Sequence, residues 1–193
     1  MKLTKILAVA ALMIAGAANA AGYAEFQYYD EENRNTKEDN IKFGVVVGNR
    51  TATNWDYSLK METSQAEIGN GSIGQGVEGR VRKSFNVDVL GVGFKPYAGV
   101  RLGQKIGSSS DFTYYAADLG VKFPLISNWL SGDVGYRYRD AFSAAHDYDS
   151  HRGHVAVSYA ITKQDSISLR YSQSFGAVSE EKNSWRVAYS HSF

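Results

Sequence analysis

Apolar and polar residues alternate with period two from Tyr23 to Phe193, in segments of about ten residues. Successive side chains of a strand point to opposite faces, and alternating segments of this length, separated by turn residues, are typical of transmembrane barrel strands. The clearest segment places Val134, Tyr136 and Tyr138 between charged or small residues. Strands are predicted near 23–30, 40–49, 54–64, 76–85, 94–104, 112–123, 131–141, 151–161, 166–175 and 184–193.

The first 21 residues have the composition of a secretory signal peptide. Lys2 and Lys5 precede an apolar run of nine residues, and Ala18-Asn19-Ala20 forms a small-residue cleavage site, so cleavage is expected after Ala20 or Ala21. A membrane anchor is the alternative, but a spanning helix needs about 20 apolar residues. The sequence therefore predicts a signal peptide over 1–21 and one exported domain over 22–193.

Alternation also fits a soluble β-sandwich, so other features must separate the two classes. The export signal is one, and a predicted inward face rich in ionised residues is another. Aromatic residues also gather near segment ends, as in the girdles at membrane interfaces. These residues are Tyr28, Tyr29, Trp55, Phe85, Tyr114, Tyr115, Phe123, Trp129, Phe142, Phe175 and Trp185.

The connections favour an all-β, transmembrane antiparallel barrel of about ten strands, with eight or twelve as alternatives. Twelve strands would leave about 14 residues per strand and connection, whereas spans need 9–11 residues plus turns. An even count places both termini in the periplasm. The outward loops are then 31–39, 65–75, 105–111, 142–150 and 176–183, and the inward turns are 50–53, 86–93, 124–130 and 162–165.

The last predicted strand ends in Phe193 and carries Trp185, Val187 and Tyr189 at alternate positions. This pattern resembles the signal that outer-membrane proteins present to the barrel-assembly machinery, and the same residues would face lipid. His191 departs from the pattern, because an apolar or aromatic residue is more usual there. An ordinary edge strand that ends in Phe is the alternative.

The predicted inward face carries twelve bases and six acids, although the net charge is only +1 for the chain and −1 without Lys2 and Lys5. Acids gather instead in the outward loops, among them Glu31, Asp147 and Glu180. Rings of bases attract anions and repel cations. The sequence predicts an anion path lined by Arg80, Arg82, Lys95, Arg101, Lys122, Arg137, Arg139, Arg152, Arg170 and Arg186. The alternative is a lumen filled by paired side chains. The protein would then be a non-conducting structural or surface-interaction barrel, and its function would lie in the outward loops.

Three stretches resemble the oligogalacturonate-specific porin family: Lys95-Pro96-Tyr97 leading into Gly99-Val100-Arg101, the segment 135–140, and the terminal strand. The resemblance covers about the C-terminal half. It implies a narrow monomeric outer-membrane channel for acidic oligosaccharides, with Arg101, Arg137 and Arg139 lining the pore. That family has twelve strands and a longer chain, so the resemblance implies a shortened relative.

Catalysis is the less favoured alternative. His146, Asp147, Asp149, His151 and His154 are similar in kind to the active-site residues of the outer-membrane protease family, but no second acidic pair accompanies them. His151 and His154 would point to opposite faces of a strand. With no cysteine in the chain, thiolate chemistry is excluded. We expect no enzyme activity, cofactor, metal or nucleic-acid partner; the expected partners are outer-membrane lipid, the assembly machinery and small anionic solutes.

Overall fold

The computed structural model describes residues 20–66, 73–106, 111–126, 129–146, 148–177 and 181–193. Most of the predicted signal peptide lies outside these residues. Within them, no helix is long and apolar enough to cross a membrane. The strands are β1 (Ala20–Asn33), β2 (Asp39–Thr51), β3 (Trp55–Ala66), β4 (Ile73–Ser84), β5 (Val87–Val89), β6 (Val92–Ile106), β7 (Phe112–Ile126), β8 (Leu130–Ala141), β9 (Ser150–Ala160), β10 (Asp165–Gly176) and β11 (Lys182–Ser192).

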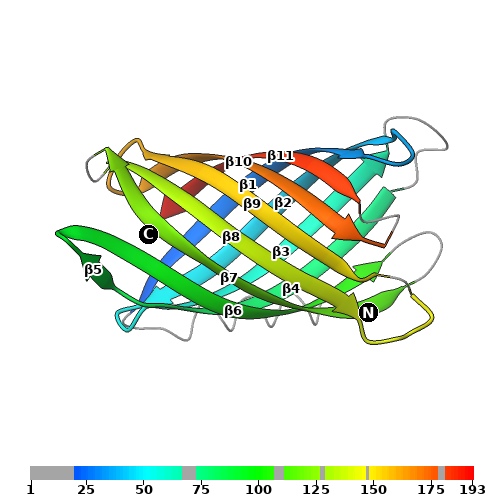
Figure 1. Cartoon of the computed structure of the whole chain (residues 1–193), viewed down its shortest axis with the longest axis horizontal. Helices are drawn as coiled ribbons and strands as arrows, with labels where there is room; N and C mark the ends of the chain where they lie inside the picture. Colours follow the sequence, from blue (N-terminus) through cyan, green and yellow to red (C-terminus); the bar gives the residue numbers. More distant parts are fainter. Residues whose placement is uncertain (1–19, 67–72, 107–110, 127–128, 147, 178–180) are drawn as a thin grey trace.

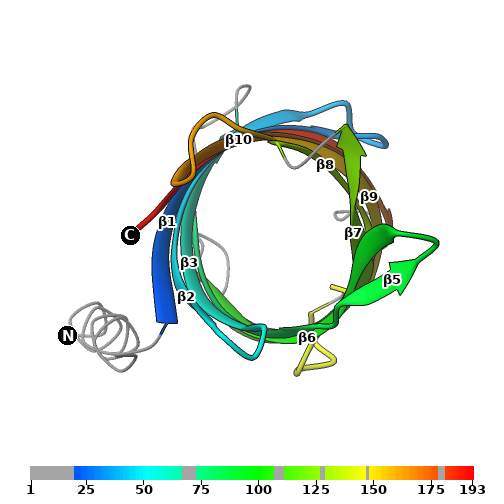
Figure 2. The ribbon, with the colours of Figure 1, turned by 90° about the vertical axis from the view of Figure 1, so that its left-hand side faces the viewer.

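Ten strands form a closed antiparallel barrel, which confirms the predicted fold class (Figures 1 and 2). Each barrel strand pairs with its neighbour in the chain, except that β4 pairs directly with β6 and the first strand pairs with the last. Closure supplies each of these strands with a hydrogen-bonding partner on both edges, as a chain in lipid requires. β1 begins and β11 ends at the same end of the barrel, called here the termini end; the other is the loop end.

The barrel has its apolar side chains outside and its polar side chains inside. On β11, the outward Trp185 and Val187 are about half exposed, whereas the inward Ser184 is 2% exposed. The same alternation runs along β6, where Val100 and Leu102 are exposed and Tyr97 is buried. This distribution is the reverse of a water-soluble domain and matches a barrel whose outer face contacts lipid.

The first connection at the loop end is a tight turn rather than the predicted loop 31–39. The Asn33 side chain accepts hydrogen bonds from the backbone N–H groups of Asn35 and Thr36, and Lys37 takes a positive φ of 58°. These contacts let β1 continue to Asn33. Glu31, predicted in the loop, therefore lies on a barrel strand.

A short extra strand, β5, occupies part of the predicted turn 86–93. It pairs only with the first residues of β6, from Val92 to Phe94, and forms a hairpin at the termini end. The tip is a two-residue turn at Leu90 and Gly91, both with positive φ. Figure 2 shows that this hairpin lies outside the ring of barrel strands.

Candidate functional site: a charged lumen

A cavity of about 330 Å³ occupies the barrel interior, and all ten barrel strands contribute to its wall. Its lining extends from Trp129 and Ser192 at the termini end to Glu31 and Arg139 at the loop end. Among its described lining residues are twelve bases and seven acids, an excess of five positive charges. An excess of bases, as expected for the inward face, is therefore present on the cavity wall.

Tyrosines lie flat against the lumen wall because a glycine on the adjacent strand makes room for each ring. Tyr23 on β1 crosses Gly48 on β2, and its hydroxyl donates a 3.0 Å hydrogen bond to Asp56 on β3. A Cβ on Gly48 would lie only 2.6 Å from the ring carbon Cζ. The arrangement recurs as Tyr97 over Gly120 to Asp133, and as Tyr114 over Gly103 to Glu78.

Several acids are held between two bases along the wall. Asp118 accepts 2.9 Å and 2.8 Å contacts from Arg82 and Arg101, and the same Arg101 reaches Glu78 at 2.8 Å. These four side chains, the two arginines and the two acids, are all mostly buried. Buried ion pairs fix geometry more than they add stability, since desolvation offsets most of the attraction. This network therefore holds its guanidinium groups in place on the wall.

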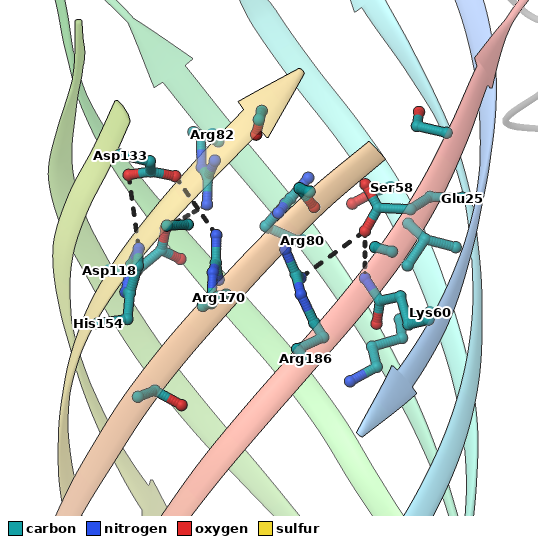
Figure 3. A pocket seen from close by; sticks show the side chains of 18 of the residues that line it. Glu25, Ser58, Lys60, Arg80, Arg82, Asp118, Asp133, His154, Arg170 and Arg186 are labelled. Atoms are coloured by element: carbon teal, nitrogen blue, oxygen red, sulfur yellow. Dashed lines mark hydrogen bonds and ion pairs between the residues drawn. The ribbon is translucent and has the colours of Figure 1, made fainter. Parts of the chain in front are cut away.

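Asp133 is a second centre, and Figure 3 shows Arg170 and His154 pointing toward it. Arg170 Nη2 lies 3.3 Å from one carboxylate oxygen, and His154 Nε2 lies 3.5 Å from the other. The Tyr97 hydroxyl donates to Asp133 at 2.9 Å. His154 is therefore a lumen residue.

Bases stand directly opposite bases at four places on the inward face. Like charges at opposed positions of an antiparallel pair are destabilising, so a fold selected for stability alone would avoid them. The opposed pairs are Arg80 with Arg101, Arg137 with Arg152, Arg170 with Arg186, and Lys95 with Lys122.

Acids neutralise these pairs unequally. Arg80 and Arg101 contact three carboxylates between them. By contrast, Arg137 makes no ion pair or hydrogen bond with any described residue, although its Nε is buried. Its neighbour Arg152 has only Glu31, at 3.8 Å. Positive charge is therefore only partly compensated near the loop end, where Glu78 acts on Arg137 from beyond ion-pair distance.

Nine of the ten predicted pore-lining residues lie on the cavity wall. The exception is Lys95, which is exposed at the termini end beyond the cavity lining. Two charged lining residues were missed, Glu31 and Arg50, because both were placed in connections. Glu31 is 2% exposed and forms an ion pair with Lys42.

The ion pairs of the described residues run along the wall and do not cross the lumen. Most join neighbouring strands, and the longest reach is from Arg152 on β9 to Glu31 on β1, three strands away in a ring of ten. Opposite walls are five strands apart. Salt-bridged layers across the lumen, which a plugged barrel would show, are therefore not formed by these residues.

The His and Asp residues near the fourth outward loop do not form one cluster. His151 lies on the outer face beside Tyr136, whereas His154 points into the lumen. His146 stacks on Phe112 with a ring-centroid distance of 4.8 Å. Asp147 lies outside the described residues, and within them no group of three acids or histidines could hold a metal ion.

The residues of the predicted assembly signal form part of the outer surface of β11. Trp185, Val187 and Tyr189 are 39–52% exposed, and the terminal Phe193 is 75% exposed. The structure also gives His191 a partner: its Nδ1 lies 2.8 Å from Asp165 Oδ1, at the start of β10. Whether these residues direct assembly stays a prediction.

The closed antiparallel barrel, its apolar exterior and its charged interior define the class of the outer-membrane β-barrels. No protein-family model matches the sequence, and no curated protein matches it. The similar solved structures include the β domain of the Bordetella autotransporter BrkA, with TM-score 0.56, 12% identity, and coverage of 90% of this chain and 99% of that one. They also include a KdgM porin, with TM-score 0.50, 17% identity, and coverage of 88% and 99%.

At these identities the likeness shows the fold. Porins and autotransporter translocator domains are outer-membrane barrels, which agrees with the predicted outer-membrane location. The likeness to a KdgM porin also agrees in fold with the family resemblance noted in the sequence.

Proposed function

We propose that this protein is a small outer-membrane channel that passes anionic solutes, acidic oligosaccharides among them, through its base-lined lumen. The observation that carries the proposal is the arrangement of the bases. Arg137 and Arg152 stand directly opposite each other on the cavity wall, and of the two only Arg152 has an acid within ion-pair distance. Such a pair has no structural advantage, but it offers an anion two guanidinium groups.

The mechanism is passive and needs no cofactor. Positive charge inside a tube with low-dielectric walls raises the local concentration of anions and lowers that of cations. Acids of the wall hold many of the bases in fixed positions, as Asp118 holds Arg82 and Arg101. A solute carboxylate can exchange from one guanidinium to the next without being trapped, because each guanidinium on this network already shares an acid.

Short side chains on one side of the lumen provide room for such a solute. The wall of β9, β10 and β11 toward the termini end carries serine and alanine instead of long charged residues. Serine hydroxyls can bond to sugar hydroxyl groups, while guanidinium groups can bond to the carboxylates. The short residues that line the cavity there are Ala156, Ser158, Ala160, Ser166, Ser168, Ala188, Ser190 and Ser192.

Uptake into vesicles tests this proposal. The purified barrel is reconstituted, and the entry of trigalacturonate is compared with that of maltotriose, a neutral trisaccharide of similar size. The proposal predicts faster entry of the acidic sugar, and a smaller difference at high salt, where charges are screened. Equal entry, or faster entry of maltotriose, would contradict it. If chloride enters and trigalacturonate does not, the anion path is supported and the acidic sugar is excluded as its solute.

A further inference from the structure

The hairpin of β5 and the start of β6, residues 85–94, carries apolar side chains that are largely exposed. Every residue from Phe85 to Val92 is exposed, and Leu90 at the tip is 98% exposed. Asp88 Oδ1 accepts a 2.9 Å hydrogen bond from the Gly91 N–H, which holds the turn closed. The hairpin is therefore a defined element with an uncovered apolar surface.

One face of this hairpin continues the lipid-facing surface of the barrel. Side chains of the same parity along β6, from Val100 and Leu102 to Val92, lie on the outer face. Across the hairpin, Val89 pairs with Val92 and Val87 pairs with Phe94, so the valines of β5 share that face. The apolar exterior thus continues along β6 beyond Ser84, the residue where the pairing of β4 with β6 ends.

Leu90 is an unusual residue for its position. Two-residue hairpin turns with positive φ at both central positions favour Asn, Asp or Gly. Leu90 has φ 55° and Gly91 has φ 80°. A leucine there is strained in its backbone and also exposes its whole side chain, and strain of this kind gathers where function maintains it.

The placement of the hairpin suits a membrane surface. Figure 1 shows it extending past the other connections at the termini end, and Figure 2 shows it turned away from the barrel axis. It does not cover the lumen. At its base, Phe94 lies 6.4 Å from Phe123 between ring centroids, so aromatic rings of the outer face continue up to it.

We propose that residues 85–94 form a membrane anchor, whose apolar face and Leu90 tip insert among the lipids of the adjacent leaflet beside the barrel. Lipid is the occupant that the structure favours, because the face is continuous with the lipid-facing surface and splays away from the axis. The free edge of β5 is the alternative docking feature, but it offers only three residues to a partner strand. The inference does not depend on the anion path.

Site-specific fluorescence tests the anchor, and the absence of cysteine in the chain makes single labels simple. Leu90→Cys is labelled with an environment-sensitive fluorophore and reconstituted in phosphatidylcholine–phosphatidylglycerol vesicles, with or without brominated acyl chains. Leu102→Cys, on the outer face, is the lipid-exposed control. Lys163→Cys, exposed in the turn between β9 and β10 at the termini end, is the water-exposed control.

The label at position 90 is expected to emit at shorter wavelength than the label at position 163. Brominated lipid should quench the labels at positions 90 and 102 and leave the label at position 163 unquenched. Emission and quenching at position 90 that match position 163 would overturn the anchor. A blue shift without lipid quenching, which disappears when the protein is diluted in lipid, would assign the surface to a second copy of the chain and would also overturn it.

Discussion

Gly48→Ala tests whether the glycines inside the barrel are there to let tyrosines lie against the wall. The new Cβ would lie 2.6 Å from Tyr23 Cζ, whereas ordinary contacts begin at 3.4 Å, so the ring must retreat by about 0.8 Å. Such a shift would stretch the 3.0 Å bond to Asp56 and the 3.1 Å bond from Arg80 beyond hydrogen-bonding distance. Each hydrogen bond to a charged group contributes about 1.5–3 kcal/mol.

The net loss of stability is smaller than the sum for both hydrogen bonds, because Arg80 and Asp56 still bond to each other without Tyr23. Alanine also gains about 0.4–1 kcal/mol over glycine through the unfolded chain. We expect Gly48→Ala to lower the free energy of unfolding by about 2 kcal/mol. The assay is urea unfolding in lipid vesicles, followed by tryptophan fluorescence.

Gly153→Ala is the matched control, since a Cβ at Gly153 would meet nothing within 4 Å. This variant should be neutral or slightly more stable. In a Tyr23→Ala background the cost of Gly48→Ala should vanish, because the ring that it displaces is absent. An undiminished cost in that background would refute the proposed cause.

Three further predictions concern the charged wall and the terminal strand. Asp118→Asn should lower the free energy of unfolding by about 3–5 kcal/mol, measured by the same urea titration, since it leaves Arg82 and Arg101 without a shared acid. Arg137→Gln should lower the anion concentration in the lumen roughly threefold, seen as reduced anion-over-cation permeability, whereas Lys163→Gln, which removes the same charge outside the lumen, should not. Deletion of Phe193 should reduce the amount of heat-modifiable, folded barrel in the outer membrane without preventing refolding of the purified chain in detergent.

The ten barrel strands were predictable because period-two alternation is a local signal. Each strand has one face in lipid and one in the lumen, so parity alone assigns most side chains. The signal fails where both faces are polar. The run Asp30-Glu31-Glu32-Asn33 has no alternation, yet β1 continues through it because β2 and β11 pair with it on both sides.

The hairpin at β5 was missed for another reason. Val87, Val89, Val92 and Phe94 do alternate around a two-residue turn, but Leu-Gly is not among the residue pairs that favour such a turn. The tyrosine–glycine–acid contacts could not be predicted at all, since each depends on the register of three strands. The same holds for which bases lack acids: parity placed Arg137 and Arg101 alike on the inward face, and only the packed structure separates them.

The charge selectivity of the reconstituted channel tests the central proposal most directly. In a planar bilayer with a KCl gradient, the current–voltage curve gives the potential at which the current reverses. An anion path through the excess of basic side chains predicts a reversal potential displaced toward the chloride equilibrium potential, and a smaller displacement for the Arg137→Gln, Arg152→Gln double variant. A barrel that does not conduct, or one whose reversal potential lies toward the potassium equilibrium potential, would contradict the account.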